Sequence, residues 1–429
     1  MTATERQVDR GSLDWLVPPT EAVVEDRDPH CDKGLYADWG RHRTLEETIN
    51  LAWHLRAEAG VSRVADITGL DRVGLPVFNT FRTTADTGNL TVTCGKGLHR
   101  PAALASALME AYERYCGEQQ GRRGPTLTVD QARECFERVL HPRDLVLDTR
   151  TDWEESAPLE WAPSRDLFAD EVVWVPADAV YTPYRAGRSR LFAGHSDGLA
   201  SGNCLTEATL HALYELVERD SRSFGEVLRL GQRVDLHSLP KSLAGVARQL
   251  TEAGIEVSLF AFRSSLEITS FFALGDDRLA ENAMLVNAGA GCHLNPAVGA
   301  ARALTELAQS RLSVISGSRE DFSTRFRDRR TETYQRAHER ATRWSEGWPA
   351  VTFDQVPDGS SGNLERDLSI VGERLRAAGL TRLLVTDLTM NPAGPRVVKV
   401  IVPGLEFVVN EPSRIGSRFY RTAREVRKG

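Results

Sequence analysis

The chain has 429 residues, of which 41% are hydrophobic and 26% charged, as is ordinary for a folded globular protein that could hold two or three average domains. Its formal net charge of −7 argues against a nucleic-acid partner. No apolar run reaches the length of a membrane span and the N-terminus carries no signal-peptide core. We therefore expect a cytoplasmic protein that has no membrane partner.

The first part of the chain divides at about residue 40. Residues 1–40 mix charge with proline, and we interpret them as an N-terminal extension. A helix is predicted from Thr44 to Ala59, because Thr44 and Glu47 form a capping box. Short strands are expected at 63–71, 73–78 and 90–94. We expect the remaining residues, 41–429, to form one large domain, because a motif described below recurs over about half of the chain.

The strand at 90–94 runs into Gly95-Lys96-Gly97 and then into a predicted helix. A glycine-rich turn and a helix N-terminus both offer free backbone N–H groups, which suit phosphate. A single GxG is weak evidence, and the P-loop pattern GxxxxGK[ST] does not occur in the chain.

Three predicted helices carry the same motif, Ala-Leu-x-Glu-x-x-(Glu or Gln), closely followed by Arg. It occurs in 106–114, 201–220 and 302–311. With the residue four positions before its first Glu, each motif places three polar residues at i, i+4 and i+7, on one face of its helix. The three sets are Ser106, Glu110 and Glu113; His211, Glu215 and Glu218; and Arg302, Glu306 and Gln309.

The second motif helix extends this polar face by two further turns, because Asn203 and Glu207 lie on it as well. Leu213, Leu216 and Val217 occupy the opposite face and can anchor the helix in a core. A solvated acidic face is the simplest interpretation of one such helix. Three copies instead predict one shared polar cavity, and its carboxylates suit Mg²⁺, which binds through carboxylates and substrate phosphates.

The rest of the chain mixes helices and strands without a regular βαβ rhythm. We expect a helix at 239–254, strands at 256–262 and 266–274, a glycine-rich turn within 284–293, and paired core strands at 383–388 and 397–402. The fold class is therefore α+β (mixed α/β), a single large domain with mostly antiparallel sheets and the three motif helices on one side.

These motifs, together with the Gly95–Gly97 turn and the run from Ser196 to Asn203, resemble the YcaO family. The resemblance covers about Arg41 to Glu406. It implies the YcaO-type fold, with the motif helices lining an ATP site. It also implies ATP and Mg²⁺ as cofactors and the activation of peptide backbone amides by O-phosphorylation. The segment 41–48 would contact the ATP phosphates through Arg41 or Arg43 and Thr48.

The resemblance allows a role to be assigned to each candidate. Metal binding and catalysis are assigned to the acidic residues Glu110, Glu113, Glu207, Glu215 and Glu218. Neutralising the transferred group is assigned to Arg302 or Arg311. Positioning the nucleotide is assigned to Arg41, Arg43, Thr48, Lys96, Ser106, Asn203, Glu306 and Gln309.

The branch of the family decides the product. The 196–203 run is similar to members that act beside a TfuA-like protein and install thioamides, and the basic C-terminal segment lacks the proline-rich tail of azoline-forming members. We therefore expect thioamidation of a ribosomally synthesised precursor peptide, with a TfuA-like or leader-binding partner. Azoline or amidine formation, another ATP-dependent kinase or ligase, and a non-catalytic peptide-binding protein remain alternatives, and a homodimer is left open.

Overall fold

A computed structural model describes residues 41–184, 191–192, 196–319 and 331–428. The predicted N-terminal extension therefore lies outside the described residues. The helices are α1 (Leu45–Leu55), α2 (Arg100–Gly117), α3 (Val129–Cys135), α4 (Leu205–Leu228), α5 (Lys241–Glu252), α6 (Pro296–Ser316), α8 (Tyr334–Ser345), α9 (Leu364–Ala377) and α10 (Ser417–Val426). No helix in these ranges is both long and apolar enough to cross a membrane.

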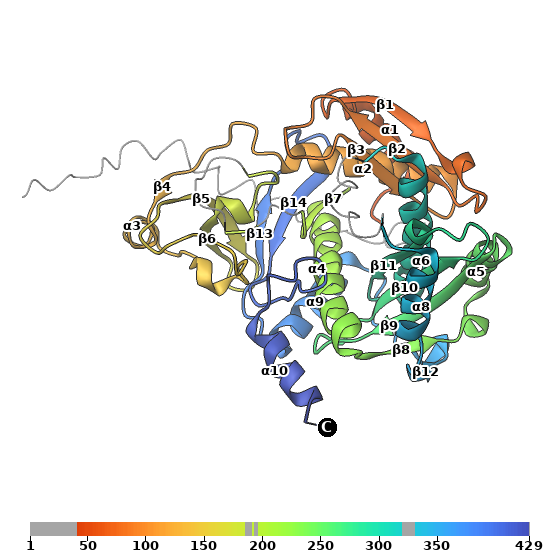
Figure 1. The fold of residues 1–429 in the computed structure, drawn as a ribbon. Helices are drawn as coiled ribbons and strands as arrows, with labels where there is room; N and C mark the ends of the chain where they lie inside the picture. Colours follow the sequence, from red (N-terminus) through yellow and green to blue (C-terminus); the bar gives the residue numbers. More distant parts are fainter. Residues whose placement is uncertain (1–40, 185–190, 193–195, 320–330, 429) are drawn as a thin grey trace, which may run out of the picture.

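The strands form three sheets (Figure 1). The first has the order β1-β2-β3, with β1 (Val61–Asp66), β2 (Val77–Arg82) and β3 (Val92–Lys96). The second has the order β11-β10-β9-β8-β12, with β8 (Gly231–Val234), β9 (Ile255–Phe262), β10 (Ser270–Asp277), β11 (Val286–Cys292) and β12 (Ala350–Val351).

The third sheet has the order β4-β5-β13-β14-β7, and β6 pairs with β5. Its strands are β4 (Thr126–Leu127), β5 (Leu159–Asp166), β6 (Glu171–Pro176), β7 (Leu199–Gly202), β13 (Leu384–Asp387) and β14 (Arg396–Ile401). The pairings in the three sheets are antiparallel, except that β12 pairs with β8 in parallel. The α+β class with mostly antiparallel sheets is therefore confirmed.

Each motif helix follows a strand that packs tightly against it, in the units β3–α2, β7–α4 and β11–α6. A glycine on each strand makes the close approach possible. A Cβ atom on Gly95 would lie 2.0 Å from the backbone nitrogen of Ala107. One on Gly202 would lie 2.4 Å from that of Ala208, and one on Gly289 would lie 2.2 Å from that of Leu307. Larger residues at these positions would push the helices off their sheets.

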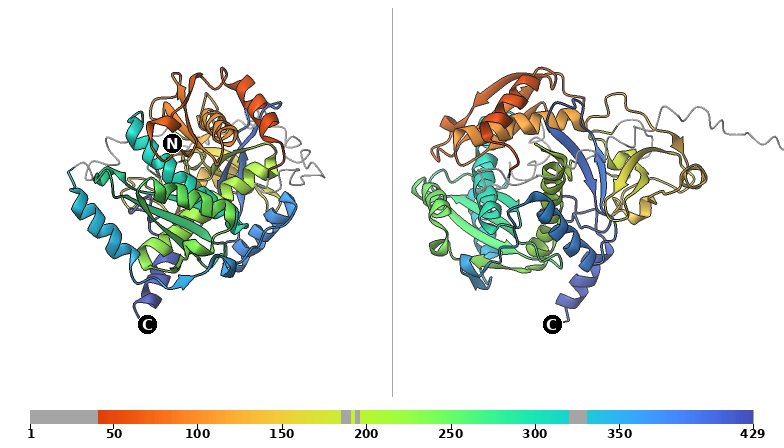
Figure 2. Two further views of the ribbon diagram at one scale, coloured as in Figure 1. Left: turned by 90° about the vertical axis from the view of Figure 1, so that its right-hand side faces the viewer. Right: turned by 180° about the vertical axis from the view of Figure 1, so that it is seen from behind.

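The apolar face of α4 lies in the core, as predicted. Leu213, Leu216 and Val217 are almost fully buried, and they belong to the same apolar cluster as Val398 and Val400 of β14. Figure 1 shows α4 running through the centre of the molecule, with α2 above it and α6 beside it, and the rear view in Figure 2 agrees. The opposite face of α4 is therefore turned toward the other two motif helices.

Several element boundaries differ from the expectations. The capping box of Thr44 and Glu47 begins α1, but the helix ends at Leu55. The strand expected at 73–78 is wrong, because β2 begins only at Val77. Gly95 and Lys96 belong to β3, and Gly97 alone of the predicted turn lies between β3 and α2. The glycine-rich stretch at Gly289 belongs to β11, and the glycines of both strands serve helix packing. The paired strands expected near the C-terminus are confirmed as β13 and β14.

Candidate active site

The polar faces of α2, α4 and α6 meet in a group of carboxylates that we call the acidic cluster: Glu110, Glu113, Glu207, Glu215, Glu218 and Glu306. Glu113 of α2 lies close enough to Glu215 of α4 for the two charges to repel, and Glu218 of α4 and Glu306 of α6 repel in the same way. The shared polar region that the motif repetition predicts is thus present.

One end of the acidic cluster holds the segment before α1. The buried carboxylate of Glu207 accepts hydrogen bonds from Arg41 Nη1 at 2.9 Å, from the backbone N–H of His42 at 2.8 Å, and from Asn203 Nδ2 at 3.1 Å. Asn203 Oδ1 in turn accepts a bond from Thr48 Oγ1 at 3.0 Å. Four predicted site residues, Arg41, Thr48, Asn203 and Glu207, are therefore brought together.

The middle of the acidic cluster is organised by Arg219. Its guanidinium forms ion pairs with Glu218 and, at 3.1 Å, with Glu215. Glu110 pairs with Arg114 at a longer distance of 3.8 Å. The two arginines that close the motifs of α2 and α4 thus orient neighbouring carboxylates.

The cations do not fully compensate these charges. Burial, together with Glu110 and Glu215, raises the pKa of Glu113 to about 8, although Arg114 opposes the shift. Burial, together with Asp197 and Glu218, raises the pKa of Glu215 to about 7. The pKa of Glu218 is raised as well, by burial and by Glu306. Carboxylates whose pKa values are raised in this way gain from a further cation, so this donor set fits a hard divalent ion such as Mg²⁺.

No group of three His, Cys, Asp or Glu residues in the described ranges has the geometry of a ready-made metal site. Mg²⁺ needs no such cage, because it is usually held by one or two carboxylates, water and substrate phosphates. The metal role of the acidic cluster stays a prediction.

Positive charge gathers beside the carboxylates. Arg302 of α6 donates to the carbonyl of Cys292 at 3.4 Å, and within the described residues no carboxylate forms an ion pair with it. Burial and then Arg41 lower the pKa of Arg302 to about 10. Two partly exposed cations held close together favour binding of an anion such as phosphate.

His211 lies at this cationic side of the site. Burial lowers the pKa of His211 well below its ordinary value, and Arg302 and Arg41 lower it further. Its Nδ1 lies 3.3 Å from the carbonyl oxygen of Ser201, which can only accept, so Nδ1 carries the proton of the neutral ring. The sequence shows His211 on the polar face but does not reveal this neutral state, which depends on charges from other elements.

The remaining nucleotide-binding candidates link α6 and α2 to β3. Lys96 forms an ion pair with Glu306, and its backbone N–H donates to Ser106 Oγ at 3.3 Å. Gln309 donates to the backbone carbonyl of Cys94. Despite burial, Lys96 and Arg219 lower the pKa of Glu306, which therefore stays ionised more readily than its neighbours.

The structure does not bring Arg311 and Arg43 into this group. Arg311 is fully buried and pairs with Asp71 at 3.0 Å and with Asp277 at 3.0 Å, so the prediction that it neutralises a transferred group is wrong. Its guanidinium is occupied in holding α6 to other elements. The side chain of Arg43 is exposed, and Arg41 is the basic residue of this segment that reaches the acidic cluster.

Two residues near the acidic cluster are not among the candidates predicted from the sequence. Asp197, in the turn before β7, accepts from Arg219 Nε at 3.3 Å. Lys399 of β14 donates to the backbone carbonyl of Asp197 at 2.8 Å. Lys399 could have been found from the sequence, because a lysine amid the apolar residues of a predicted core strand at 397–402 is unusual.

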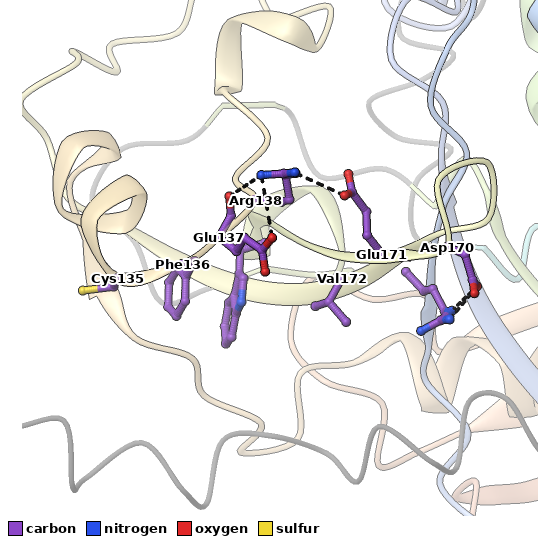
Figure 3. A pocket seen from close by; sticks show the side chains of 9 residues that line it. Cys135, Phe136, Glu137, Arg138, Asp170, Glu171 and Val172 are labelled. Carbon is purple, nitrogen blue, oxygen red and sulfur yellow. Dashed lines mark hydrogen bonds and ion pairs between the residues drawn. The ribbon is translucent and has the colours of Figure 1, made fainter.

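A separate hollow of about 460 Å³ lies far from the acidic cluster along the chain, beside β6. We call it the β6 hollow, and Figure 3 shows the residues that line it: Cys135, Phe136, Glu137, Arg138, Arg165, Asp170, Glu171, Val172 and Trp174. Arg138 pairs with Glu171 at 3.1 Å, and Arg165 bonds to Asp170 at 3.0 Å. Both arginines of the β6 hollow therefore already have carboxylate partners.

Comparison with known proteins agrees with this geometry. The model of a family described as YcaO cyclodehydratase, ATP- and Mg²⁺-binding, matches residues 94–406. An uncharacterized protein of Methanothermobacter thermautotrophicus is 38% identical over 378 residues, which cover 87% of this chain and 96% of that protein. An uncharacterized protein of Rhizobium leguminosarum bv. trifolii, described as lying in the tfuA 3′ region, is 34% identical over 86% of this chain and 90% of its own length.

A solved structure shares the fold. The structure of YcaO from Methanopyrus kandleri, bound with AMPPCP and Mg²⁺, has a TM-score of 0.74 and 26% sequence identity. The match covers 90% of this chain and 98% of that one. The architecture described above is thus that of a known fold.

Proposed function

The chain belongs to the YcaO family, and from this premise we propose that it uses ATP and Mg²⁺ to activate a backbone amide of a ribosomally synthesised peptide. The observation that carries the proposal is the charge distribution of the site. Three carboxylates with raised pKa values, of which Glu218 is buried and Glu113 and Glu215 are partly exposed, lie beside Arg302, which has no carboxylate partner in the described part of the chain. A Mg²⁺–triphosphate complex suits both features, because its metal ion compensates the carboxylates and its phosphates offer a partner to Arg302.

The carboxylates of Glu113, Glu215 and Glu218, with Glu110 and Glu207, would hold the Mg²⁺ ions. The bound Mg²⁺ neutralises charge on the phosphates. Arg302, Arg41 and Lys96 supply the positive charges for the phosphate groups, and Arg302 neutralises the charge that develops during transfer. Four polar side chains would position the nucleotide or metal-bound water by hydrogen bonds: Asn203, Thr48, Ser106 and Gln309.

Phosphorylation solves a specific problem of amide chemistry. The oxygen of a backbone amide is a poor leaving group, so a nucleophile that adds to the carbonyl carbon is expelled again. Once the oxygen carries a phosphoryl group, it leaves as phosphate. Positioned cations are sufficient for this transfer, and no nucleophile from the protein is needed.

We propose a thioamide as the product, with an external sulfide equivalent as the nucleophile. Two observations support it: the run from Ser196 to Asn203 resembles thioamide-forming members, and the Rhizobium relative lies in a tfuA 3′ region. A TfuA-like protein is the partner that follows from this proposal. The cyclodehydratase description of the family supports azoline formation as the second candidate.

Mass spectrometry tests the proposal. The purified chain is incubated with Mg²⁺–ATP, a candidate precursor peptide and a TfuA-like protein, with and without sulfide. We expect ADP release that depends on the peptide, and a heavier product in which sulfur replaces one oxygen. A product lighter by one water, formed without sulfide, would favour the azoline. Peptide binding without ATP consumption would indicate a non-catalytic protein.

A further inference from the structure

The turn Ser196–Gly198 and the strand β7 that follows it touch two of the proposed metal ligands through backbone groups. The N–H of Gly198 donates to Glu215 Oε2 at 3.3 Å. The N–H of Ser201 donates to Glu113 Oε2 at 2.9 Å, and Ser201 Oγ lies 3.2 Å from the same oxygen. One segment thereby orients carboxylates from α4 and α2, so their positions depend on where this segment lies.

The turn is held in place by β14, which lies next to β7 and α4 in Figure 1. Lys399 Nζ donates to the carbonyl of Asp197 at 2.8 Å, and the N–H of Val400 donates to the carbonyl of Gly198 at 2.8 Å. Gly198 has a φ of +79°, and a Cβ there would lie 2.4 Å from the carbonyl oxygen of Val400. Only glycine fits a turn that approaches the strand so closely.

Lys399 is an unusual residue for this place. It is 3% exposed, and Val397 and Ile401, which share its face of the strand, lie in an apolar core cluster. Burying an ammonium group costs free energy, and burial lowers the pKa of Lys399 to about 8 even though Asp197 and Glu215 oppose the shift. An apolar side chain would avoid that cost, so the ammonium group requires another explanation than core packing.

We infer that Lys399 is a positioning residue, which holds the Asp197–Gly198 turn against β14 and thereby fixes Glu215 and Glu113 for the Mg²⁺–nucleotide complex. Asp197 extends the same arrangement, because its carboxylate bonds to Arg219, which in turn pairs with Glu215. This inference rests on the proposed nucleotide site. It adds a role for a residue outside the three motifs.

A second role for Lys399 is possible on physical grounds, since an ammonium group also offsets nearby carboxylate charge. The two roles predict opposite changes in the affinity for Mg²⁺ when Lys399 is removed. If Lys399 only supplies charge, its removal makes the acidic cluster more negative, and Mg²⁺ binding becomes tighter. If Lys399 positions the turn, its removal loosens Glu215 and Glu113, and binding becomes weaker.

Two variants separate these roles, because Lys399→Met and Lys399→Gln remove the same charge but only glutamine keeps a hydrogen-bond donor. The probe is Mg²⁺–AMPPCP, with its affinity measured by titration calorimetry and folding checked by thermal unfolding. We expect Lys399→Met to bind about 10- to 100-fold more weakly than the wild type, and Lys399→Gln to retain most of the affinity. Lys241→Met, which removes an exposed lysine at the start of α5, is the control and should bind as the wild type does.

These measurements separate an error in the role of Lys399 from an error in the proposed nucleotide site. Tighter or equal binding by Lys399→Met, or equal weakening in both variants, would overturn the positioning role while leaving the nucleotide site intact. If Lys399→Met does not fold, a folded Lys399→Gln decides the matter: near-normal binding supports the inference, and lost binding contradicts it. Absence of binding by the wild type would overturn the nucleotide site and this inference with it.

Discussion

The acidic cluster and the β6 hollow both gather charged side chains, but their charges are arranged differently. In the β6 hollow, Arg138 and Arg165 already pair with carboxylates, among them Glu171 and Asp170 (Figure 3). In the acidic cluster, carboxylates from three helices repel one another, and burial raises the pKa values of Glu113 and Glu215 to about 8 and about 7.

The difference teaches that concave shape alone does not indicate a site. Surface ion pairs contribute little energy and leave no charge to be met by a ligand. Buried like charges cost stability, and a fold keeps them where a ligand compensates the cost. Variants in both regions test this contrast.

Replacing both Glu215 and Glu218 by glutamine should remove two of the proposed metal ligands of the acidic cluster. We expect binding of Mg²⁺–AMPPCP to weaken by about 1,000-fold, because two charged ligands are lost. The unfolding temperature should change little, because the double variant loses the desolvation cost of two carboxylates together with their ion pairs to Arg219. Calorimetry and thermal unfolding measure the two effects, and normal binding by a folded double variant would contradict the site.

Arg311 and Arg302 lie on the same helix, but we expect substitution of Arg311 to lower stability and substitution of Arg302 to lower nucleotide affinity. Arg311→Met leaves Asp71 and Asp277 buried without their shared partner, so we expect the free energy of unfolding to fall by about 3–5 kcal/mol. Denaturant unfolding measures this loss. An unchanged stability would show that Arg311 is not the structural residue that its contacts indicate.

Arg302→Met should leave folding intact and weaken nucleotide binding. Its guanidinium is held at a lowered pKa by burial and by Arg41, so the folded chain gains little from its charge before an anion binds. We expect the affinity for AMPPCP to fall about 10- to 100-fold, as for a lost hydrogen bond to a charged group. A stability loss as large as that of Arg311→Met, with normal affinity, would reverse the assignment.

The smallest effects are expected in the β6 hollow. Glu171→Gln breaks the pair with Arg138, yet we expect the free energy of unfolding to change by no more than about 0.5 kcal/mol. Binding of Mg²⁺–AMPPCP should be unaffected. A clear loss of nucleotide binding in this variant would show that the β6 hollow belongs to the functional site after all.

The three motif helices, the polar face of each and the family can be read from the amino-acid sequence alone. These features depend on local periodicity, because residues at i, i+4 and i+7 share a helix face wherever the helix lies. The apolar positions of α4, such as Leu213 and Leu216, are buried as that periodicity predicts. The α+β class followed from the order of the elements for the same local reason.

Which side chains share the site depends on tertiary packing. Arg41 reaches Glu207 across 166 residues of sequence, and Lys399 reaches Asp197 across 202. Arg311 ends its motif as Arg219 does, yet it pairs with Asp71 and Asp277 instead of the acidic cluster. Glycines that look like turn residues, such as Gly289, pack a strand against a helix. A contact between distant segments depends on how the sheets and helices pack, and no local pattern encodes that packing.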